Sequence, residues 1–132
     1  RDGTIDIIAT DHAPHDLADK QVEYQNACFG IVGLETALPL TLKLVDEGIF
    51  SLSDAVKKLT SSPSDIFDLN SGNLSVGQQA DIVIFDPDSN YKIDTSKFHS
   101  KSKNTPFDGW EVKGKILHTL VNGKVVYSAI EN

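Results

Sequence analysis

Residues 5–15 read IDIIATDHAPH, an apolar run that ends in a cluster of ionisable side chains. The run Thr4–Ala9 is typical of a short strand buried on both faces, as in a parallel sheet. One aspartate, two histidines and a proline follow it within six residues. Because α/β barrels build their active sites at the carboxyl ends of their strands, the position of Asp11 favours a functional role.

Metal binding and proton transfer are the chemistry that this cluster offers. The Asp11 carboxylate suits a divalent metal, and it is equally able to accept a proton during catalysis. The structural alternative is that Asp11 caps a turn, His12 is a hydrogen-bonded buried histidine and Pro14 fixes the loop. Since the chain has no HxH or HExxH motif to complete a metal site, spacing alone leaves both interpretations open.

Three other reactive side chains are expected to have no catalytic role. Cys28 is predicted to be a small buried apolar side chain, because no neighbouring base can be inferred for it. His99 is expected in a solvated loop, and His118 on the surface of a strand.

Composition excludes several classes of protein. The chain has 132 residues, 39% of them hydrophobic, which suffices for a real core. Its net charge of −7 excludes a nucleic-acid partner, and no apolar run is long enough to span a membrane. The single cysteine and the lack of a signal-like segment predict a cytoplasmic protein. Because the chain begins RDGTID and contains no methionine, we expect a fragment of a longer protein.

Two helices are predicted after an irregular loop at 16–30. Apolar side chains at helical spacing predict the first, which begins near Thr36 because Pro39 is tolerated only in a first turn, and which ends at Gly48. Ser51 and the aspartate three residues later predict a capping box for a second helix. Pro63 is expected to stop that helix and to begin a short helical turn.

The last third of the chain is β-rich. A run from Ala80 to Phe85, closed by Asp86 and Pro87, predicts a strand. Asn122–Gly123 lies between two further β-rich runs, the strongest short-range indication of a hairpin with a type I′ turn.

The predicted elements divide the chain into two regions. We place the boundary between about Asp68 and Gly72, with an α/β region at 1–68 and an all-β region at 69–132. The expected fold class is therefore α/β plus β.

Five segments, in this order along the chain, resemble bacterial class I dihydroorotases of the amidohydrolase superfamily. They read ATDHAPH (9–15), FGIVGLETALPL (29–40), SPSDIFDL (62–69), GNLSVGQQADIVIFDPD (72–88) and SKNTPFDGWEVKGKILHTLVNGKVVY (102–127). The resemblance implies a (β/α)8 barrel that carries one or two zinc ions, flanked by a small β-sandwich. This chain would supply the last barrel strand and the closing helices, followed by the sandwich segment.

The resemblance also implies a reaction and a set of site residues. The family catalyses the reversible cyclisation of N-carbamoyl-L-aspartate to L-dihydroorotate in de novo pyrimidine synthesis. Asp11 would bind zinc and shuttle a proton, and His15 would hold the substrate carboxylate. Backbone groups of Phe29 and Gly30 would contact the substrate ring. Since a catalytic zinc needs about three protein ligands, we expect the fragment alone to be inactive.

Two alternatives stay open at this stage. One is a dihydropyrimidinase or hydantoinase, although such relatives usually lack a histidine at the position of His15. The other is a non-catalytic dihydroorotase-like subunit that scaffolds aspartate transcarbamoylase. Because a barrel segment alone leaves apolar faces and unpaired edges exposed, we expect that the rest of the barrel is present as another chain or that copies pair through those surfaces. The predicted partners are a second copy in a homo-oligomer and, as the alternative, aspartate transcarbamoylase.

Overall fold

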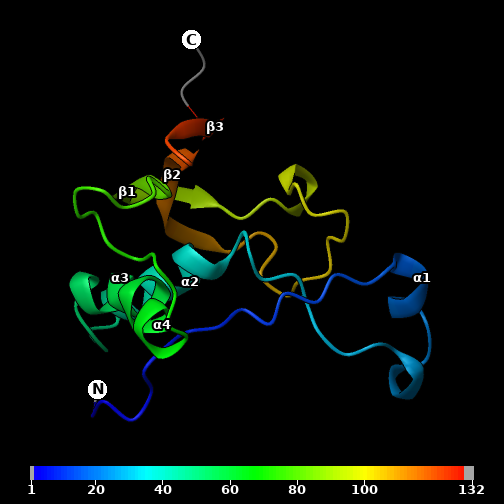
Figure 1. The fold of residues 1–132 in the computed structure, drawn as a ribbon. Coiled ribbons are helices and arrows are strands. Elements are labelled where there is room, and N and C mark those ends of the chain that lie inside the picture. Colours follow the sequence, from blue (N-terminus) through cyan, green and yellow to red (C-terminus); the bar gives the residue numbers. More distant parts are fainter. Residues whose placement is uncertain (1, 130–132) are drawn as a thin grey trace.

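The computed structural model describes residues 2–129, in which helices come first and strands last (Figure 1). The helical elements are α1 (Leu17–Lys20), the 3-10 turn η1 (Tyr24–Asn26), α2 (Ala37–Asp46), α3 (Leu52–Leu59) and α4 (Ser61–Ile66). The remaining elements are β1 (Ile82–Lys92), the 3-10 turn η2 (Thr95–Lys97), β2 (Glu111–Val121) and β3 (Lys124–Ser128). No helix in this part of the chain is long and apolar enough to cross a membrane.

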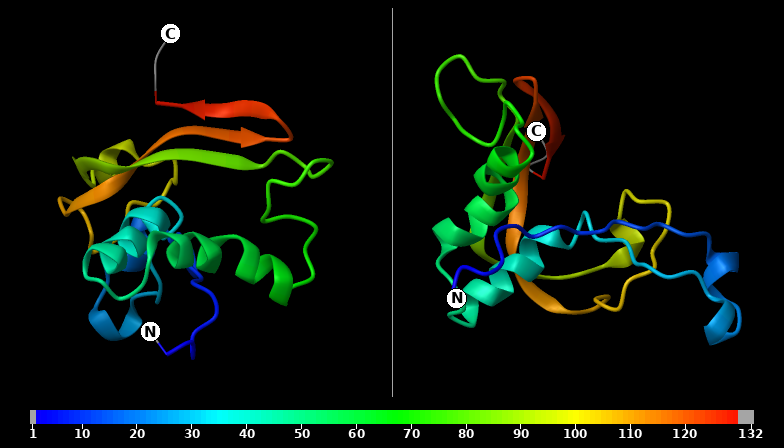
Figure 2. Two further views of the ribbon diagram at one scale, coloured as in Figure 1. Left: turned by 90° about the vertical axis from the view of Figure 1, so that its left-hand side faces the viewer. Right: turned by 60° about the horizontal axis from the view of Figure 1, so that its bottom comes forward.

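The strand predicted at Thr4–Ala9 is absent, so this prediction is wrong. A strand exists through hydrogen bonds to a neighbouring strand, and the three strands described within residues 2–129 pair only with one another. The segment is held by α3 instead. The Ile8 N–H donates to the Lys58 carbonyl at 3.1 Å, and the Lys58 ammonium donates to the Ile5 carbonyl. From there the chain leads away from the other helices toward α1 (Figure 2).

The helix predicted to begin near Thr36 is confirmed as α2, with Thr36 as its N-cap. Pro39 lies in the first turn, where its missing N–H costs no helical hydrogen bond. Gly48 follows the helix with a φ of 66°, a left-handed conformation that glycine adopts without strain.

The predicted cap of the next helix is also confirmed. The Ser51 hydroxyl accepts a hydrogen bond from the Asp54 N–H at 3.1 Å at the start of α3. It also donates to the Asp54 carboxylate at 2.7 Å, and this bond lowers the pKa of Asp54. The following helix, α4, begins at Ser61 rather than at Pro63. Its first turn still contains the proline, because the first N–H groups of a helix have no helical partner.

The strands form one antiparallel sheet in the order β1-β2-β3. The predicted type I′ hairpin is confirmed, since Asn122 and Gly123 join β2 to β3 with φ values of 54° and 74°. Positive φ at both turn positions matches the twist of the flanking strands, so this pair of residues decides where β2 ends.

The predicted end of the first strand at Asp86 and Pro87 is wrong, because β1 continues to Lys92. The register steps from the Asp86–Lys115 pair to the Asn90–Lys113 pair, so residues 87–89 bulge opposite a single residue of β2. A proline has no N–H to lose from the ladder at such a bulge.

Helix α2 packs against β2, and a glycine makes the contact close (Figure 2). Gly114 has a φ of 94°, and a Cβ added to it would lie 2.2 Å from Leu42 Cδ1. The Lys113 ammonium reaches Asp46 at the end of α2, at 3.0 Å. The buried apolar side chains come from both parts of the structure: Val32, Leu42, Ala55, Ile93 and Val112.

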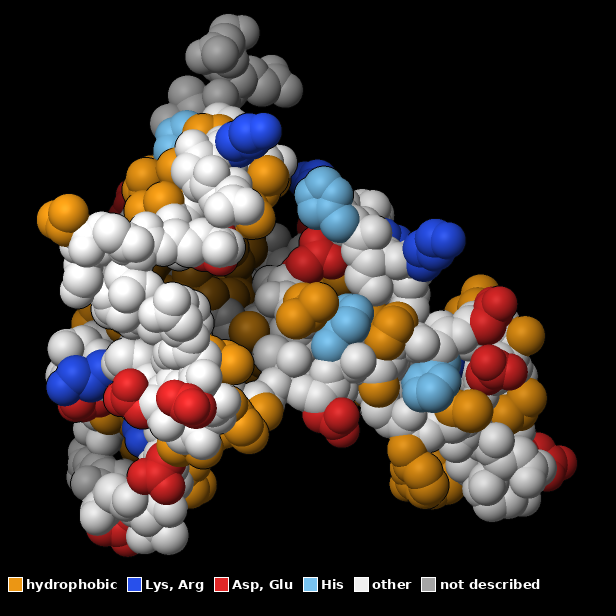
Figure 3. All heavy atoms as spheres, in the orientation of Figure 1, with side chains coloured by type: hydrophobic (Ala, Val, Ile, Leu, Met, Phe, Trp, Pro, Cys, Tyr) orange, Lys and Arg blue, Asp and Glu red, His pale blue; other side chains and the backbone are white. Residues whose placement is uncertain are grey.

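Many large apolar side chains remain exposed, and Figure 3 shows them over the helices and the sheet alike. Leu34 is 64% exposed and Leu74 is 81% exposed. A small core beside so much exposed apolar surface is the pattern expected of a segment that packs against further protein.

Candidate functional site

The site is built where the ATDHAPH and FGIVG segments, residues 9–15 and 29–33, lie side by side. The Ala13 N–H donates to the Ile31 carbonyl at 2.9 Å. Two loops that are distant in sequence are therefore joined through their backbones at the predicted motif.

His12 holds the same two segments together. Its Nδ1 accepts hydrogen bonds from the N–H groups of Gly33 at 3.0 Å and Leu34 at 3.4 Å. An accepting Nδ1 places the proton of the neutral imidazole on Nε2. His12 is thus a half-buried, hydrogen-bonded structural residue, which agrees with the structural interpretation of its sequence position.

Gly30 and His15 are brought together. Gly30 has a φ of 99°, and a Cβ there would lie 2.5 Å from Ala13 Cβ and 3.7 Å from His15 Nε2. Only glycine allows the backbone to approach the DHAPH motif so closely. The imidazole of His15 consequently lies beside the main chain of Gly30.

Two side chains fix the carbonyl group of Gly30. Lys20 Nζ donates to it at 2.8 Å, and Asn104 Nδ2 donates to it at 2.9 Å. The Lys20 ammonium also donates to the Cys28 carbonyl, and the Asn104 carbonyl accepts the Val32 N–H at 2.9 Å. With its carbonyl engaged twice, the Gly30 peptide has a defined orientation.

A shallow hollow opens beside His15. Its lining includes one acidic residue, Asp16, together with His15, Lys20, Lys101, Lys103 and Asn104. Three lysines stand out in a chain whose net charge is −7. The ammonium groups of Lys20 and Lys103 and the amide of Asn104 already donate to backbone carbonyls. Within residues 2–129, Lys101 and His15 are therefore the lining side chains that suit a ligand with a negative charge.

Asp11 and Phe29 are placed differently from the other predicted site residues. Asp11 is exposed and has a φ of 44°, a conformation that few residues besides glycine, aspartate and asparagine adopt. Within residues 2–129 its carboxylate has no hydrogen-bond or ion-pair partner. The Phe29 side chain is 93% exposed. Both side chains therefore remain accessible to a ligand.

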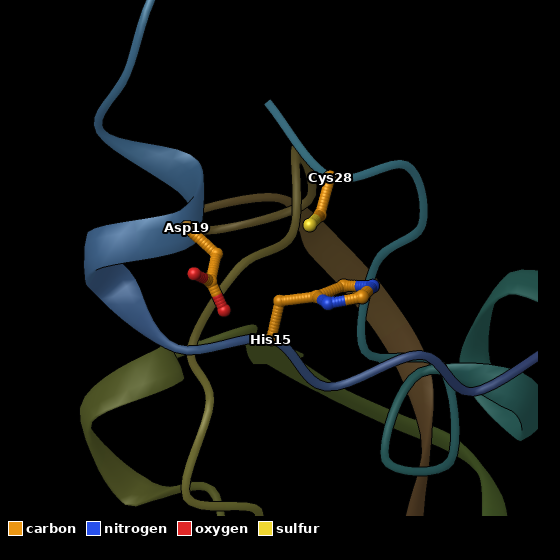
Figure 4. Close-up of side chains that lie close together, drawn as sticks. All are labelled: His15, Asp19 and Cys28. Carbon is orange, nitrogen blue, oxygen red and sulfur yellow. The ribbon is translucent and has the colours of Figure 1, made fainter. Parts of the chain in front are cut away.

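The prediction that Cys28 is buried is wrong, because the residue is exposed. Its backbone is the anchored part, with the Cys28 N–H donating to the Asp19 carbonyl at 3.2 Å. The thiol points toward His15 and Asp19, and the ligand atoms of the three residues lie within 4.8 Å of one another (Figure 4). In the part of the chain that the structure describes, this is the one group of three metal-ligand side chains that converge.

Comparison with known proteins identifies the family. Residues 1–126 match the sequence profile of the amidohydrolase family. The chain belongs to this family. The amidohydrolase chain is 50% identical over 127 residues to the dihydroorotase of Syntrophus aciditrophicus strain SB, covering 96% of this chain and 30% of that protein. It is 55% identical over 128 residues to the dihydroorotase of Anaplasma phagocytophilum strain HZ, covering 97% of this chain and 29% of that protein. The resemblance to dihydroorotases is therefore confirmed.

Solved structures of hydantoinases share the fold. L-hydantoinase (dihydropyrimidinase) from Arthrobacter aurescens matches with a TM-score of 0.88 and 38% identity, over 98% of this chain and 30% of that chain. D-hydantoinase (dihydropyrimidinase) from Thermus sp. matches with a TM-score of 0.86 and 27% identity, over 96% and 29%. This amidohydrolase chain thus spans about 30% of the length of the proteins that it matches.

Sequence reasoning missed two residues of the candidate site, Lys20 and Asn104. Lys20 lies in the polar loop that separates the two motif segments, where a lysine is usually solvated. Asn104 lies within SKNTPF, a segment that contributes to the family resemblance but carries no assigned role. Both act on the Gly30 carbonyl through contacts that no local pattern reveals.

Proposed function

We propose that the protein to which this chain belongs is a dihydroorotase, a hydrolase that interconverts N-carbamoyl-L-aspartate and L-dihydroorotate in pyrimidine biosynthesis. The observation that carries the proposal is the identity of about 50% to dihydroorotases across 96% of the chain. The hollow beside His15 supports it, because both substrates carry carboxylates that its donors suit.

Asp11 is the proposed metal ligand and proton carrier. Its exposed carboxylate has no partner within residues 2–129, so it fits a role as one ligand of a divalent metal, which we take to be zinc. When bound, the metal would activate water and polarise the amide carbonyl. An ionised Asp11 would take up a proton in ring opening and return it to the leaving nitrogen. Because one carboxylate is too few for a catalytic zinc, the remaining ligands come from the rest of the protein.

His15, Phe29 and Gly30 are the proposed substrate contacts. The His15 imidazole would donate to the substrate carboxylate, and the backbone of Phe29 and Gly30 would contact the ring. The close packing of Gly30 against Ala13 supports this arrangement, because it leaves main-chain atoms rather than a side chain at this position.

A dihydropyrimidinase or hydantoinase is the second candidate, since the matching solved structures carry those names. Dihydrouracil lacks the carboxylate of dihydroorotate, so a cationic hollow beside His15 favours the latter. The third interpretation, a non-catalytic subunit, is disfavoured by the presence of Asp11 and His15.

Turnover of the two substrates distinguishes the candidates. We expect the full-length protein to process dihydroorotate with a kcat/KM at least tenfold above that for dihydrouracil, because only dihydroorotate engages the donors beside His15. Steady-state assays of ring opening measure kcat/KM for each of the two substrates. A preference for dihydrouracil would favour the hydantoinase, and turnover of neither would favour the non-catalytic subunit.

A substitution of Lys20 tests whether its hydrogen bond to the Gly30 carbonyl orients the loop at 28–33 for substrate binding. We expect Lys20→Met in the full-length enzyme to raise the KM for dihydroorotate about tenfold, since a charged hydrogen bond contributes about 1.5 to 3 kcal/mol. The kcat should change less, because Lys20 orients the binding loop and does not touch the reacting atoms. Lys20→Arg should recover part of the loss. Lys97→Met is the matched control, because Lys97 pairs with Asp94 on the surface; an equal effect there would contradict the assigned role.

The architecture and setting of the complete protein are inferred from the family. We take residues 1–68 as the closing part of a (β/α)8 barrel and residues 69–132 as a β-sandwich segment, of which 130–132 lie outside the described residues. We also predict, from the family, that the complete protein forms a homo-oligomer or binds aspartate transcarbamoylase. Its predicted location is the cytoplasm.

A further inference from the structure

We propose that His15, Asp19 and Cys28 form a binding site for a thiophilic divalent cation, of which Zn²⁺ and Cd²⁺ are the simplest examples. Occupation of the site would take His15 away from the substrate and so inhibit the enzyme. The binding half of this inference stands on geometry alone, whereas the inhibition half rests on the proposed function.

The backbone holds the three residues in a fixed relation. His15 precedes α1, Asp19 lies in α1 and Cys28 follows η1. The Cys28 N–H donates to the Asp19 carbonyl at 3.2 Å, and the Lys20 ammonium donates to the Cys28 carbonyl. These bonds tie the helix to the loop, so the three side chains face one another without any further rearrangement of the chain (Figure 4).

The distances suit one ion. The imidazole nitrogen, the carboxylate oxygen and the thiol sulfur all lie within 4.8 Å of one another. Ligand atoms around a tetrahedral zinc ion lie about 3.3 to 3.8 Å apart. Rotation of the exposed Asp19 and Cys28 side chains is enough to close the difference. Three protein ligands would leave the fourth position to water.

The donor set selects the class of cation. One sulfur, one nitrogen and one oxygen ligand suit Zn²⁺ and Cd²⁺, whereas Mg²⁺ and Ca²⁺ prefer oxygen ligands. A carboxylate and a thiolate also neutralise the two charges of the ion. Exposure of Asp19 and Cys28 gives the ion access from solvent.

Binding of a cation would compete with binding of substrate. His15 Nε2 lies 3.7 Å from the position of a Cβ on Gly30, so the imidazole borders the proposed substrate loop. An imidazole that ligates a cation through one nitrogen keeps its hydrogen on the other nitrogen, but the bond to the metal holds the ring beside Asp19 and Cys28, so it can no longer turn toward the substrate carboxylate. Added cation should therefore raise the apparent KM and leave kcat unchanged.

The experiment is a titration of full-length protein, carrying its resident metal, with Cd²⁺. Thiolate-to-cadmium charge transfer gives an ultraviolet absorption that His and Asp ligands alone do not give. We expect wild type to show one equivalent of this signal and Cys28→Ala to lack it. Asp19→Asn should weaken binding at least tenfold. Zn²⁺ should also protect Cys28 from iodoacetamide, as read by peptide mass mapping.

A second measurement tests inhibition. In wild type, micromolar Zn²⁺ added to the zinc-loaded enzyme should raise the apparent KM for dihydroorotate severalfold, and Cys28→Ala should keep its basal activity and lose this effect. An unchanged cadmium signal in Cys28→Ala, or no protection of Cys28, overturns the site. A cadmium signal with an unaffected KM overturns the inhibition. If dihydroorotate is not turned over at all, the proposed function fails while the absorption still decides the cation site.

Discussion

Asp11→Asn should lower the kcat of the full-length protein for dihydroorotate by about 10²- to 10⁴-fold, the range that a general acid–base group contributes. The amide has the same shape as the carboxylate but neither accepts the proton nor neutralises a metal. Asparagine also tolerates the left-handed backbone of this position, where φ is 44°. Loss of activity in this variant therefore reports chemistry and not a damaged fold.

A matched substitution separates the role of Asp11 from a general effect of charge. Asp6→Asn removes another exposed carboxylate from the same segment and should leave kcat within about twofold, as surface substitutions away from special features do little. Steady-state kinetics and the melting temperature of both variants make the comparison. Substantial turnover by Asp11→Asn at unchanged metal content would show that another group carries the proton.

Gly114→Ala should destabilise the protein by about 2 to 5 kcal/mol. Two costs add: a positive φ of 94°, and a methyl group placed 2.2 Å from Leu42 Cδ1. Backbone strain contributes about 1 to 2 kcal/mol, and overpacking contributes about 1 to 3 kcal/mol. Helix α2 would have to move away from β2, so the midpoint of denaturant unfolding should fall clearly.

Gly77→Ala is the matched control for this prediction. Its φ of 93° is nearly the same, yet no atom lies within 4 Å of the added Cβ. We expect it to show the strain alone. Combining Gly114→Ala with Leu42→Ala should cost less than the sum of the two single changes, because the smaller side chain makes room. Equal effects of the two glycine substitutions would contradict the packing argument.

The elements that the sequence predicts correctly are those whose signals are local. Ser51 caps α3 through a residue three positions away, and Asn122 with Gly123 forms a turn by itself. The strand at Thr4–Ala9 was wrongly predicted, because an apolar run forms a strand only where a partner is present. The continuation of β1 past Pro87 was missed for a related reason: a bulge depends on the opposing strand.

The same division holds for the candidate site. The resemblance to dihydroorotases implied roles for Asp11, His15 and Gly30, and the structure brings His15 and Gly30 together. Lys20 and Asn104 were missed because their contact with Gly30 is set by the tertiary fold. Cys28 is exposed, whereas its residue type favours burial, because its backbone N–H and carbonyl are hydrogen-bonded to Asp19 and Lys20 in a surface loop.

The hydrogen bonds to the Gly30 carbonyl also affect the order in which the protein folds during synthesis. Its partner Asn104 lies 74 residues further along the chain, and the Glu35 carboxylate likewise reaches the N–H of His99, 64 residues away. Contacts of such long range form late, because closing a long loop costs entropy before the contact repays it. On the ribosome, the loop at 28–33 emerges well before residue 104 exists. The contact of Gly30 with Asn104 can therefore form only after residue 104 has been synthesised, whereas the bonds of Lys20 and Ala13 to the loop need no later residue.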